Sequence, residues 1–361
     1  MKIYNFALLQ LFAEAGTLVN ATGNYVNAYT GETQAFDGKN TLSGELKVFY
    51  DTELLENARI EMYYAQFAKK QRLPKNHGTT VEWRKWNTFA KAGKLQEGVI
   101  PTGQKFGMSS KTGTIDQYGT FATISDKLEL RAYDDTILGA TEEMGASAAE
   151  TQETLIRDAL LVNTNVLYCD NITLADGSVA STPTAPDAME ASATVMSVLT
   201  PDMVAKAVTQ MKKDRVPTIN GKYYAVIHPS VAYDLRKSEA WVEAHKYASV
   251  EEIKNGEIGE LHGCRFVENV FAPVLGGEYV NKAGSKTYAT YFFGNDAFGI
   301  IDPEGGALEM IIKDRSEIGG PLNQFSTVGY KFETNGATIL YSERVLRVMS
   351  CSSFSATDEA N

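Results

Sequence analysis

The stretch with the clearest chemical potential is a basic one that also carries tryptophan, KKQRLPKNHGTTVEWRKW, at residues 69–86. Lysine and arginine bind phosphate or carboxylate oxygens, and tryptophan rings stack on nucleic-acid bases. Residues 69–94 hold eight basic residues and one acidic residue, Glu82, an excess of seven positive charges. Because the whole chain has a net charge of −11, the remainder carries −18. The stretch therefore suits either a polyanion or an acidic protein surface.

Three interpretations of this stretch are open: nucleic-acid contact through charge and stacking, a solvated charged face, and docking on an acidic surface of an identical neighbour. We favour the third, because a chain of net charge −11 repels duplex DNA. The candidate contact residues are Lys69, Lys70, Arg72, Lys75, Trp83, Arg84, Lys85 and Trp86. The acidic residues proposed to receive them are Asp134, Asp135, Glu142 and Glu143.

Other chemistry finds little support in the sequence. The four histidines are isolated and show no metal-binding spacing, and His228, beside Pro229, is typical of a strand end. Nucleophile-elbow, dinucleotide and phosphate-loop motifs are absent. The three cysteines are far apart and form no C-x-x-C pair, which favours a reducing compartment. We therefore expect no enzyme activity, no cofactor and no bound metal. No apolar run approaches the roughly 18 residues of a membrane span, so we also expect no membrane partner.

The tryptophans require an element that presents them. Residues 80–89 alternate in character, with Val81 and Trp83 on one side, which predicts one limb of a long hairpin. We expect the return limb at 112–133 and an exposed glycine-containing tip at 92–111. Both faces of such a hairpin are mixed in character, so we expect it to complete its packing on another molecule.

The rest of the chain predicts a mixed α and β protein. Residues 51–68 have helical spacing, and a 35-residue helix is expected at 134–168, with an apolar stripe that runs from Ile137 to Val166. Thr200 and Pro201 predict a helix start, and Asn335-Gly336 predicts a tight hairpin turn. Strands are expected at KYYAVIHP, GCRFVENV and TYATYFFG, and residues 169–199 read as a connector.

Several stretches together resemble a known family. LPKNHGTTVEWRKW (73–86), GEIGELHGCRFVEN (256–269) and GGPLNQFSTVGYKF (319–332) occur in this order, and LLQLFAEAG (8–16) resembles openings of phage structural proteins. The chain resembles the major capsid proteins of tailed bacteriophages over nearly its whole length. This resemblance implies the α+β Hong Kong 97-like fold.

The resemblance also implies a division of the chain. It assigns an N-terminal arm at 1–60, an extended E-loop hairpin at 61–132, and a P domain with spine helix and connector at 133–199. An A domain would follow at 200–309, and 310–361 would contribute the C-terminal strands of the P-domain sheet. We expect flexible joins at the hairpin tip and at the connector.

As partners, the resemblance implies copies of the same chain, assembled as pentamers and hexamers into an icosahedral head around double-stranded DNA. The acidic surface predicts weak, non-specific contact with that DNA. A separate scaffolding protein is expected because residues 1–60 lack coiled-coil heptads. A portal and a decoration protein are further expected partners, with assembly in the bacterial cytoplasm and final location in the virion.

Three alternatives stay open. The chain could form an encapsulin-like compartment shell, which a cargo peptide would reveal. It could bind single-stranded nucleic acid through Trp83 and Trp86, with salt-dependent affinity. It could also be a soluble α/β enzyme with its site in residues 200–309, which a pocket with perturbed carboxylates would support.

Overall fold

The computed structural model describes residues 25–26, 33–34, 63–238, 241 and 257–361, apart from residues 88, 96, 99, 101–102, 132–135, 307, 319–323 and 356–357. The chain divides into two units, Met1–Ala58 and Arg59–Asn361. In the first unit, β1 (Tyr25–Val26) and β2 (Thr33–Gln34) form an antiparallel pair. The helix expected at 51–68 lies outside the described residues up to 62, and Tyr64–Phe67 form the 3-10 helix η1.

The second unit contains a seven-stranded sheet in the order β12-β13-β11-β15-β20-β7, with β14 paired to β15. Its strands are β7 (Val166–Tyr168), β11 (Tyr223–Ile227), β12 (Glu257–Leu261), β13 (Cys264–Glu268), β14 (Val274–Leu275), β15 (Thr287–Phe293) and β20 (Val345–Ser350). Every residue of β15 and β20 is buried, as expected for central strands covered on both faces.

Two helices pack against this sheet, α4 (Pro201–Lys213) and α5 (Pro229–Lys237). The predicted start of α4 is confirmed: the Thr200 side chain accepts a hydrogen bond from the Met203 backbone N–H, with proline next to the cap. At the start of α5, His228 follows the last residue of β11 and its Nδ1 accepts from the Ser230 N–H at 3.2 Å. His228 is thus a strand-end residue and a helix cap.

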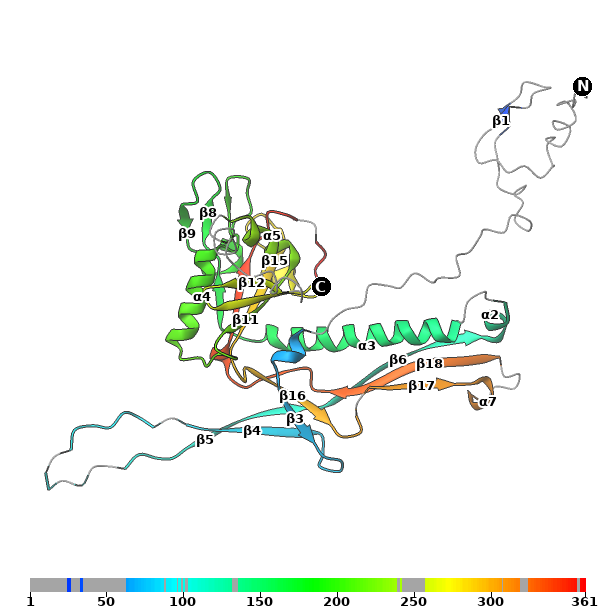
Figure 1. Cartoon of the computed structure of the whole chain (residues 1–361), viewed down its shortest axis with the longest axis horizontal. Coiled ribbons are helices and arrows are strands. Elements are labelled where there is room, and N and C mark those ends of the chain that lie inside the picture. The colour runs from blue at the N-terminus through cyan, green and yellow to red at the C-terminus, as the bar shows by residue number, and fades with distance from the viewer. Residues whose placement is uncertain are drawn as a thin grey trace, which may run out of the picture. The chain divides into compact units, whose positions relative to one another are not determined.

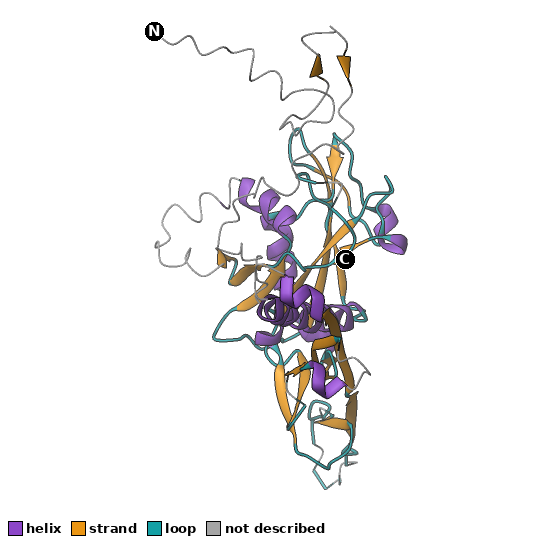
Figure 2. Cartoon of the chain, turned by 90° about the vertical axis from the view of Figure 1, so that its right-hand side faces the viewer, coloured by secondary structure: helices purple, strands orange, loops and turns teal. Residues whose placement is uncertain are grey.

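The longest helix, α3 (Thr136–Leu161), lies along a three-stranded antiparallel sheet in the order β17-β18-β6 (Figure 1). The strands are β6 (Asp116–Ser125), β17 (Glu309–Lys313) and β18 (Phe325–Thr334). Alternate residues of β18, among them Val328, Tyr330 and Phe332, are buried, and the last two join Ala148 of α3 in one cluster. Figure 2, where α3 points toward the viewer, shows this helix beside the strands.

The helix is shorter than the 35 residues expected. It ends at Leu161, Val162 is exposed, and Val166 belongs to β7. Asn163 ends it: its side-chain amide donates to the carbonyls of Ser342 and Val345, so the chain leaves the helix and enters the seven-stranded sheet. The apolar periodicity across this break was coincidental.

A buried aromatic cluster joins α3 to the larger sheet. Tyr64 of η1 packs edge-on against Tyr291 and Phe293 of β15. Beside it, Oε1 of the buried Glu153 accepts hydrogen bonds from the N–H groups of Tyr63 and Tyr64 and from the Asn269 amide. Burial raises the pKa of the Glu153 carboxyl, and these hydrogen bonds partly offset the rise. The start of the second unit is thereby fixed to α3.

Smaller sheets complete the unit. They have the orders β19-β16-β3, β10-β8-β9 and β4-β5. Their strands are β3 (Lys69–Leu73), β4 (Thr80–Trp86), β5 (Met108–Thr114), β8 (Asn171–Thr173), β9 (Val179–Ser181), β10 (Val195–Met196), β16 (Phe298–Pro303) and β19 (Thr338–Ile339). Short helices are α2 (Asp126–Arg131), α7 (Arg315–Ile318), η2 (Pro186–Ala188), η4 (Gly277–Tyr279) and η5 (Ser342–Arg344).

Three expectations about local structure need correction. The segment 169–199, read as a connector, contains β8–β10 around the buried Asn171, whose side chain bonds Ser181, Ala188 and Glu190. The Asn335-Gly336 turn joins no hairpin: β18 pairs with β6 and β17, and β19 pairs with β16. Instead, the Asn335 side chain bonds the backbone of β16 at Ile301 and Gly299.

The third correction concerns the strands after residue 310. We expected all of them beside the long helix, and β17 and β18 do lie there. In contrast, β20 lies in the seven-stranded sheet between β15 and β7. Its six fully buried residues need cover on both faces, which that sheet provides. Among the described residues, no helix is both long and apolar enough to span a lipid bilayer.

Candidate interaction site on the basic hairpin

The predicted hairpin exists, with a different return limb. Strand β4 pairs antiparallel with β5 from Thr80↔Thr114 to Trp86↔Met108. The expected return limb from Thr112 onward belongs mostly to β6, which pairs with β18. The break falls at Ile115, which is buried between β5 and β6. Residues 108–125 are therefore one run of strand-forming sequence whose two halves belong to different sheets.

The two tryptophans of β4 have different environments. The ring of Trp83 lies against two glycines: a Cβ added at Gly299 would be 2.8 Å from Trp83 Cζ2, and one at Gly113 would be 2.9 Å from Cζ3. Trp86 is 61% exposed and stacks on Phe106 across the hairpin, with ring centroids 4.1 Å apart. Phe89 stacks on the same Phe106 at 5.4 Å. Trp83 thus attaches the hairpin to its own chain, while Trp86, Phe106 and Phe89 form an exposed aromatic ladder.

Four of the predicted basic contact residues already pair with acids of the same chain. Lys69 lies 3.8 Å from Asp296 and Arg72 lies 3.0 Å from Glu304, both across the parallel pair β3–β16. Arg84 bonds Glu82 at 3.0 Å, and Lys85 lies 3.7 Å from Glu343. The hydrogen bond from Arg84 lowers the pKa of Glu82. Exposed pairs of this kind contribute little stability, so these cations stay accessible to other anions.

The other two predicted lysines differ. Lys70 is exposed on β3, and it has no ion pair within the described part of the chain. Lys75 lies with its aliphatic stem against Gly305, where an added Cβ would come within 2.7 Å of Lys75 Cε. Gly305 has φ of +92°, so the loop requires glycine there.

Of the predicted acidic patch, Asp134 and Asp135 lie outside the described residues. Glu142 and Glu143 are exposed near the start of α3. Among the described residues, the structure brings the basic stretch and these two glutamates together by no ion pair.

The sequence analysis missed an apolar groove on the face of the β17-β18-β6 sheet that α3 leaves uncovered. Its volume is about 320 Å³ and its lining includes Gly119, Phe121, Ile311 and Gly329. Ile311, Gly329 and Phe121 stand opposite one another across the three strands, and Gly119 stands opposite Lys331. Phe121 is 71% exposed. The alternation of glycine with larger residues in YGTFATI and STVGYKF was a usable signal.

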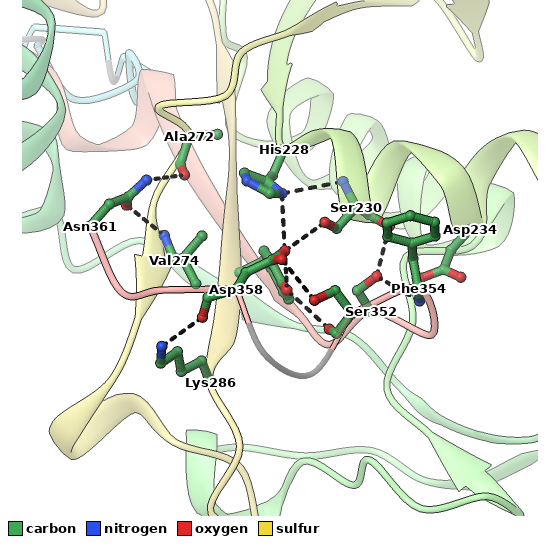
Figure 3. A network of polar contacts seen from close by, with 12 residues as sticks. His228, Ser230, Asp234, Ala272, Val274, Lys286, Ser352, Phe354, Asp358 and Asn361 are labelled. Atoms are coloured by element: carbon green, nitrogen blue, oxygen red, sulfur yellow. Dashed lines mark hydrogen bonds and ion pairs between the residues drawn. The ribbon is translucent and has the colours of Figure 1, made fainter. Parts of the chain in front are cut away.

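One cluster contains the residue types of a hydrolase triad and lacks its connections (Figure 3). The Ser230 hydroxyl donates to Asp358 at 2.6 Å, and His228 Nδ1 accepts a backbone N–H instead of the serine hydroxyl. Asp358 also accepts from Tyr288 and Ser355, both at 2.7 Å. Burial would raise the pKa of Asp358, but these hydrogen bonds lower it overall. The network fixes segment 352–361 onto the start of α5.

Cysteine and metal chemistry find no geometric support either. All three cysteines are buried, and burial raises the pKa of each thiol, which disfavours the reactive thiolate. Within the described ranges, no three His, Cys, Asp or Glu side chains are placed to hold a metal ion.

Comparison with known proteins gives one family match. The family described as phage capsid protein matches residues 109–332. No curated protein matches the chain.

Solved structures with this fold are numerous. The cyanophage Pam1 capsid asymmetric unit has 12% identity and a TM-score of 0.66, over 88% of this chain and 98% of that one. The capsid of cyanophage P-SCSP1u has 15% identity and a TM-score of 0.59, over 87% and 97%. The capsid of Ralstonia phage GP4 has 15% identity and a TM-score of 0.59, over 88% and 97%. At identities this low, the structural similarity establishes a shared fold.

Proposed function

Because the chain belongs to the phage capsid protein family and has the Hong Kong 97-like fold, it is a major capsid protein of the phage head, and we propose that its hairpin holds neighbouring copies together in that head. Its place is in the virion, and its role is structural. We assign β4–β5 as the E-loop, α3 with its three-stranded sheet as the P domain, and the seven-stranded sheet with α4 and α5 as the A domain.

The observation that carries this proposal is the aromatic ladder. Trp86, Phe89 and Phe106 are each more than half exposed, on a hairpin that has no core of its own. Burial of the exposed part of three rings removes roughly 300 Å² of apolar surface, worth about 7 kcal/mol at about 25 cal/mol/Å² before the entropic terms of association. A second copy offers a matching surface, because the groove around Phe121 is apolar and open.

We further propose pentamers and hexamers that close into an icosahedral shell around double-stranded DNA, assembled in the bacterial cytoplasm. A net charge of −11 supports this, since a container that grips phosphate would slow DNA entry and exit. A separate scaffolding protein, a portal and a decoration protein remain proposed partners. The acidic patch of Asp134, Asp135, Glu142 and Glu143 remains the proposed electrostatic receiver of the basic stretch.

The first experiment is negative-stain electron microscopy with native mass measurement of the purified chain, alone and with a co-expressed scaffolding candidate. Rings of five or six subunits, sheets or shells support the proposal. A monomer that never assembles in any of these conditions overturns it.

The hairpin's part is tested by the double variant Trp86→Ala with Phe106→Ala. We expect assembly to fall at least tenfold at fixed protein concentration while the monomer's unfolding curve is unchanged. The matched control is Phe354→Ala, which removes an exposed ring from another part of the chain. Equal assembly by the double variant and the wild type would mean that the ladder makes no contact between copies.

A further inference from the structure

A basic cleft lies where the hairpin joins the rest of its chain. Its larger part, about 450 Å³, lies between β4, the loop after α4 and η5. A smaller part, about 140 Å³, lies between the two hairpin strands and the segment before η5. Arg84, Lys85 and Tyr341 line both parts, so the two form one continuous surface.

The charge of this cleft is opposite to that of the chain. Two acids line it, Asp214 and Glu343. The cations that line it are Lys69, Arg84, Lys85, Lys111, Arg215 and Arg344. The cleft thus has four positive charges in excess, which leaves −15 on the rest of a chain of net charge −11.

Several of these cations are available to a partner. Among the described residues, Lys111 and Arg215 form no ion pair, and the Arg344 guanidinium donates to the carbonyl of Asn295 at 2.8 Å instead of a carboxylate. Lys69, Arg84 and Lys85 each pair with a carboxylate of the chain, which shows that this surface accommodates carboxylate groups.

Two of the cations, Arg344 and Lys85, are held in place before any partner arrives, and the backbone that carries Arg215 is fixed. The guanidinium carbon of Arg344 lies 3.6 Å from the ring centroid of Tyr341, and Lys85 Nζ lies 4.5 Å from it. Arg215 has φ of +55°, and the N–H groups of Arg215 and Val216 bond the carbonyls at the end of α4. Pre-positioned guanidinium groups lose little entropy when they bind a planar anion.

The aromatic rings of the cleft are already used. Two cations lie over Tyr341, Trp83 lies against Gly299, and Trp86 stacks on Phe106. Single-stranded nucleic acid is bound by basic grooves that also offer free rings for its bases. Among the rings that line this cleft, Trp86 is exposed, and one exposed ring is no platform for successive bases, which favours a carboxylate partner.

We propose that this cleft binds a carboxylate-bearing segment of a second copy of the chain. The inference rests on the proposed function and identifies the group that the base of the hairpin contacts. The partner follows from charge. The cleft has a net charge of +4, and the rest of each copy has a net charge of −15. Opposite charges steer the encounter of two copies and select the docking position. The aromatic ladder supplies apolar contact farther along the hairpin. The charges of the cleft fix the position of the neighbouring copy at the base of the hairpin.

Zero-length carbodiimide cross-linking of assembled particles tests this directly, because the reagent joins a lysine to a carboxylate only when they are in contact. Particles are made from an equal mixture of ¹⁴N- and ¹⁵N-labelled chains, so mass spectrometry separates links between copies from links within one copy. We expect mixed-label links from Lys111 to an acidic peptide. A link to Glu142 or Glu143 would also identify the proposed receiving patch.

A matched pair of variants gives a second readout. We expect Arg215→Glu with Lys111→Glu to slow assembly at least tenfold at low salt, with the difference shrinking as salt rises. Lys212→Glu with Lys213→Glu, two exposed changes at the end of α4 with the same total change in charge, should change the rate less than twofold. Far-ultraviolet circular dichroism confirms that each variant is folded.

The outcomes are distinct. Particles that form at the normal rate in the double variant, or that give no mixed-label link from Lys111, overturn the inference and leave the proposed function intact. Binding of a DNA oligonucleotide that is lost in the Arg215→Glu with Lys111→Glu variant, without any mixed-label link, also overturns it and assigns the cleft to nucleic acid. Failure of the wild-type chain to form any oligomer overturns both.

Discussion

The seven-stranded sheet and the hairpin are built from the same kind of element and differ in where their apolar surface is covered. All seven residues of β15 are buried within the chain, whereas six of the seven residues of β5 are exposed. The sheet obtains its neighbours from α4, α5 and its own strands. The hairpin is attached through Trp83 and through Lys85, and its other rings stack on one another. This strand pair has no core within its own chain, and we propose that it completes its packing on another chain.

The test with the largest expected effect removes an aromatic ring from each region. Phe292→Ala deletes a fully buried ring of β15 that packs edge-on against Phe266, and we expect a loss of about 3–5 kcal/mol in the free energy of unfolding. Phe106→Ala in the hairpin should change it by less than about 0.5 kcal/mol. Urea denaturation followed by circular dichroism measures both. A hairpin variant that destabilises the monomer as much as the sheet variant would refute the contrast.

A second test targets the joint between the two regions. A Cβ at Gly299 meets the Trp83 ring at 2.8 Å, so Gly299→Ala should destabilise the chain by about 1–3 kcal/mol and change Trp83 fluorescence. Gly93→Ala is the control, because an added Cβ there meets nothing within 4 Å. If Gly299→Ala leaves fluorescence and stability unchanged, Trp83 does not attach the hairpin.

The smallest effect concerns pH and the network around segment 352–361. Burial lowers the pKa of His228, and Asp358 partly offsets this, so the folded chain holds fewer protons there than the unfolded chain. The stability that this site contributes above pH 6.5 is therefore lost as the pH falls below it. The lowered pKa of Asp358 adds a second loss at still lower pH, below its ordinary 3.8.

The variant His228→Asn isolates the first step, because asparagine can cap α5 without titrating. The protection factors of the amides of residues 352–355, corrected for the intrinsic pH dependence of exchange, should fall between pH 6.5 and 5 in the wild type and stay constant in the variant. Parallel profiles for the two proteins would exclude His228 as the titrating group.

Local signals predicted much of this fold. The cap at Thr200, the buried run of β11 and the alternation of Val81 and Trp83 each depend on near neighbours in sequence, so the sequence could reveal them. The predicted helix was too long, because the apolar spacing continues past Leu161. The hydrogen bonds that end the helix join Asn163 to the carbonyls of Ser342 and Val345, which are distant in sequence.

Long-range pairing explains the remaining errors at the candidate site. Lys69 and Asp296 are paired through the register of β3 with β16, which no sequence pattern near either residue reveals. The return limb was misplaced because residues 112–133 read as one limb, whereas β5 ends at Thr114, β6 begins at Asp116, and the buried Ile115 divides them between two sheets. The basic contact residues were identified by type, but the cleft they form with Arg215 and Arg344 depends on the fold.

The position of β20 has a consequence for synthesis. Strand β20 lies between β15 and β7, so the sheet has a gap until residues 345–350 leave the ribosome, and β3 has no partner until residues 299–303 have been made. Because such distant pairings form last, a partly made chain lacks a finished sheet and a fixed hairpin joint. We therefore expect incomplete chains to be unable to join a growing shell.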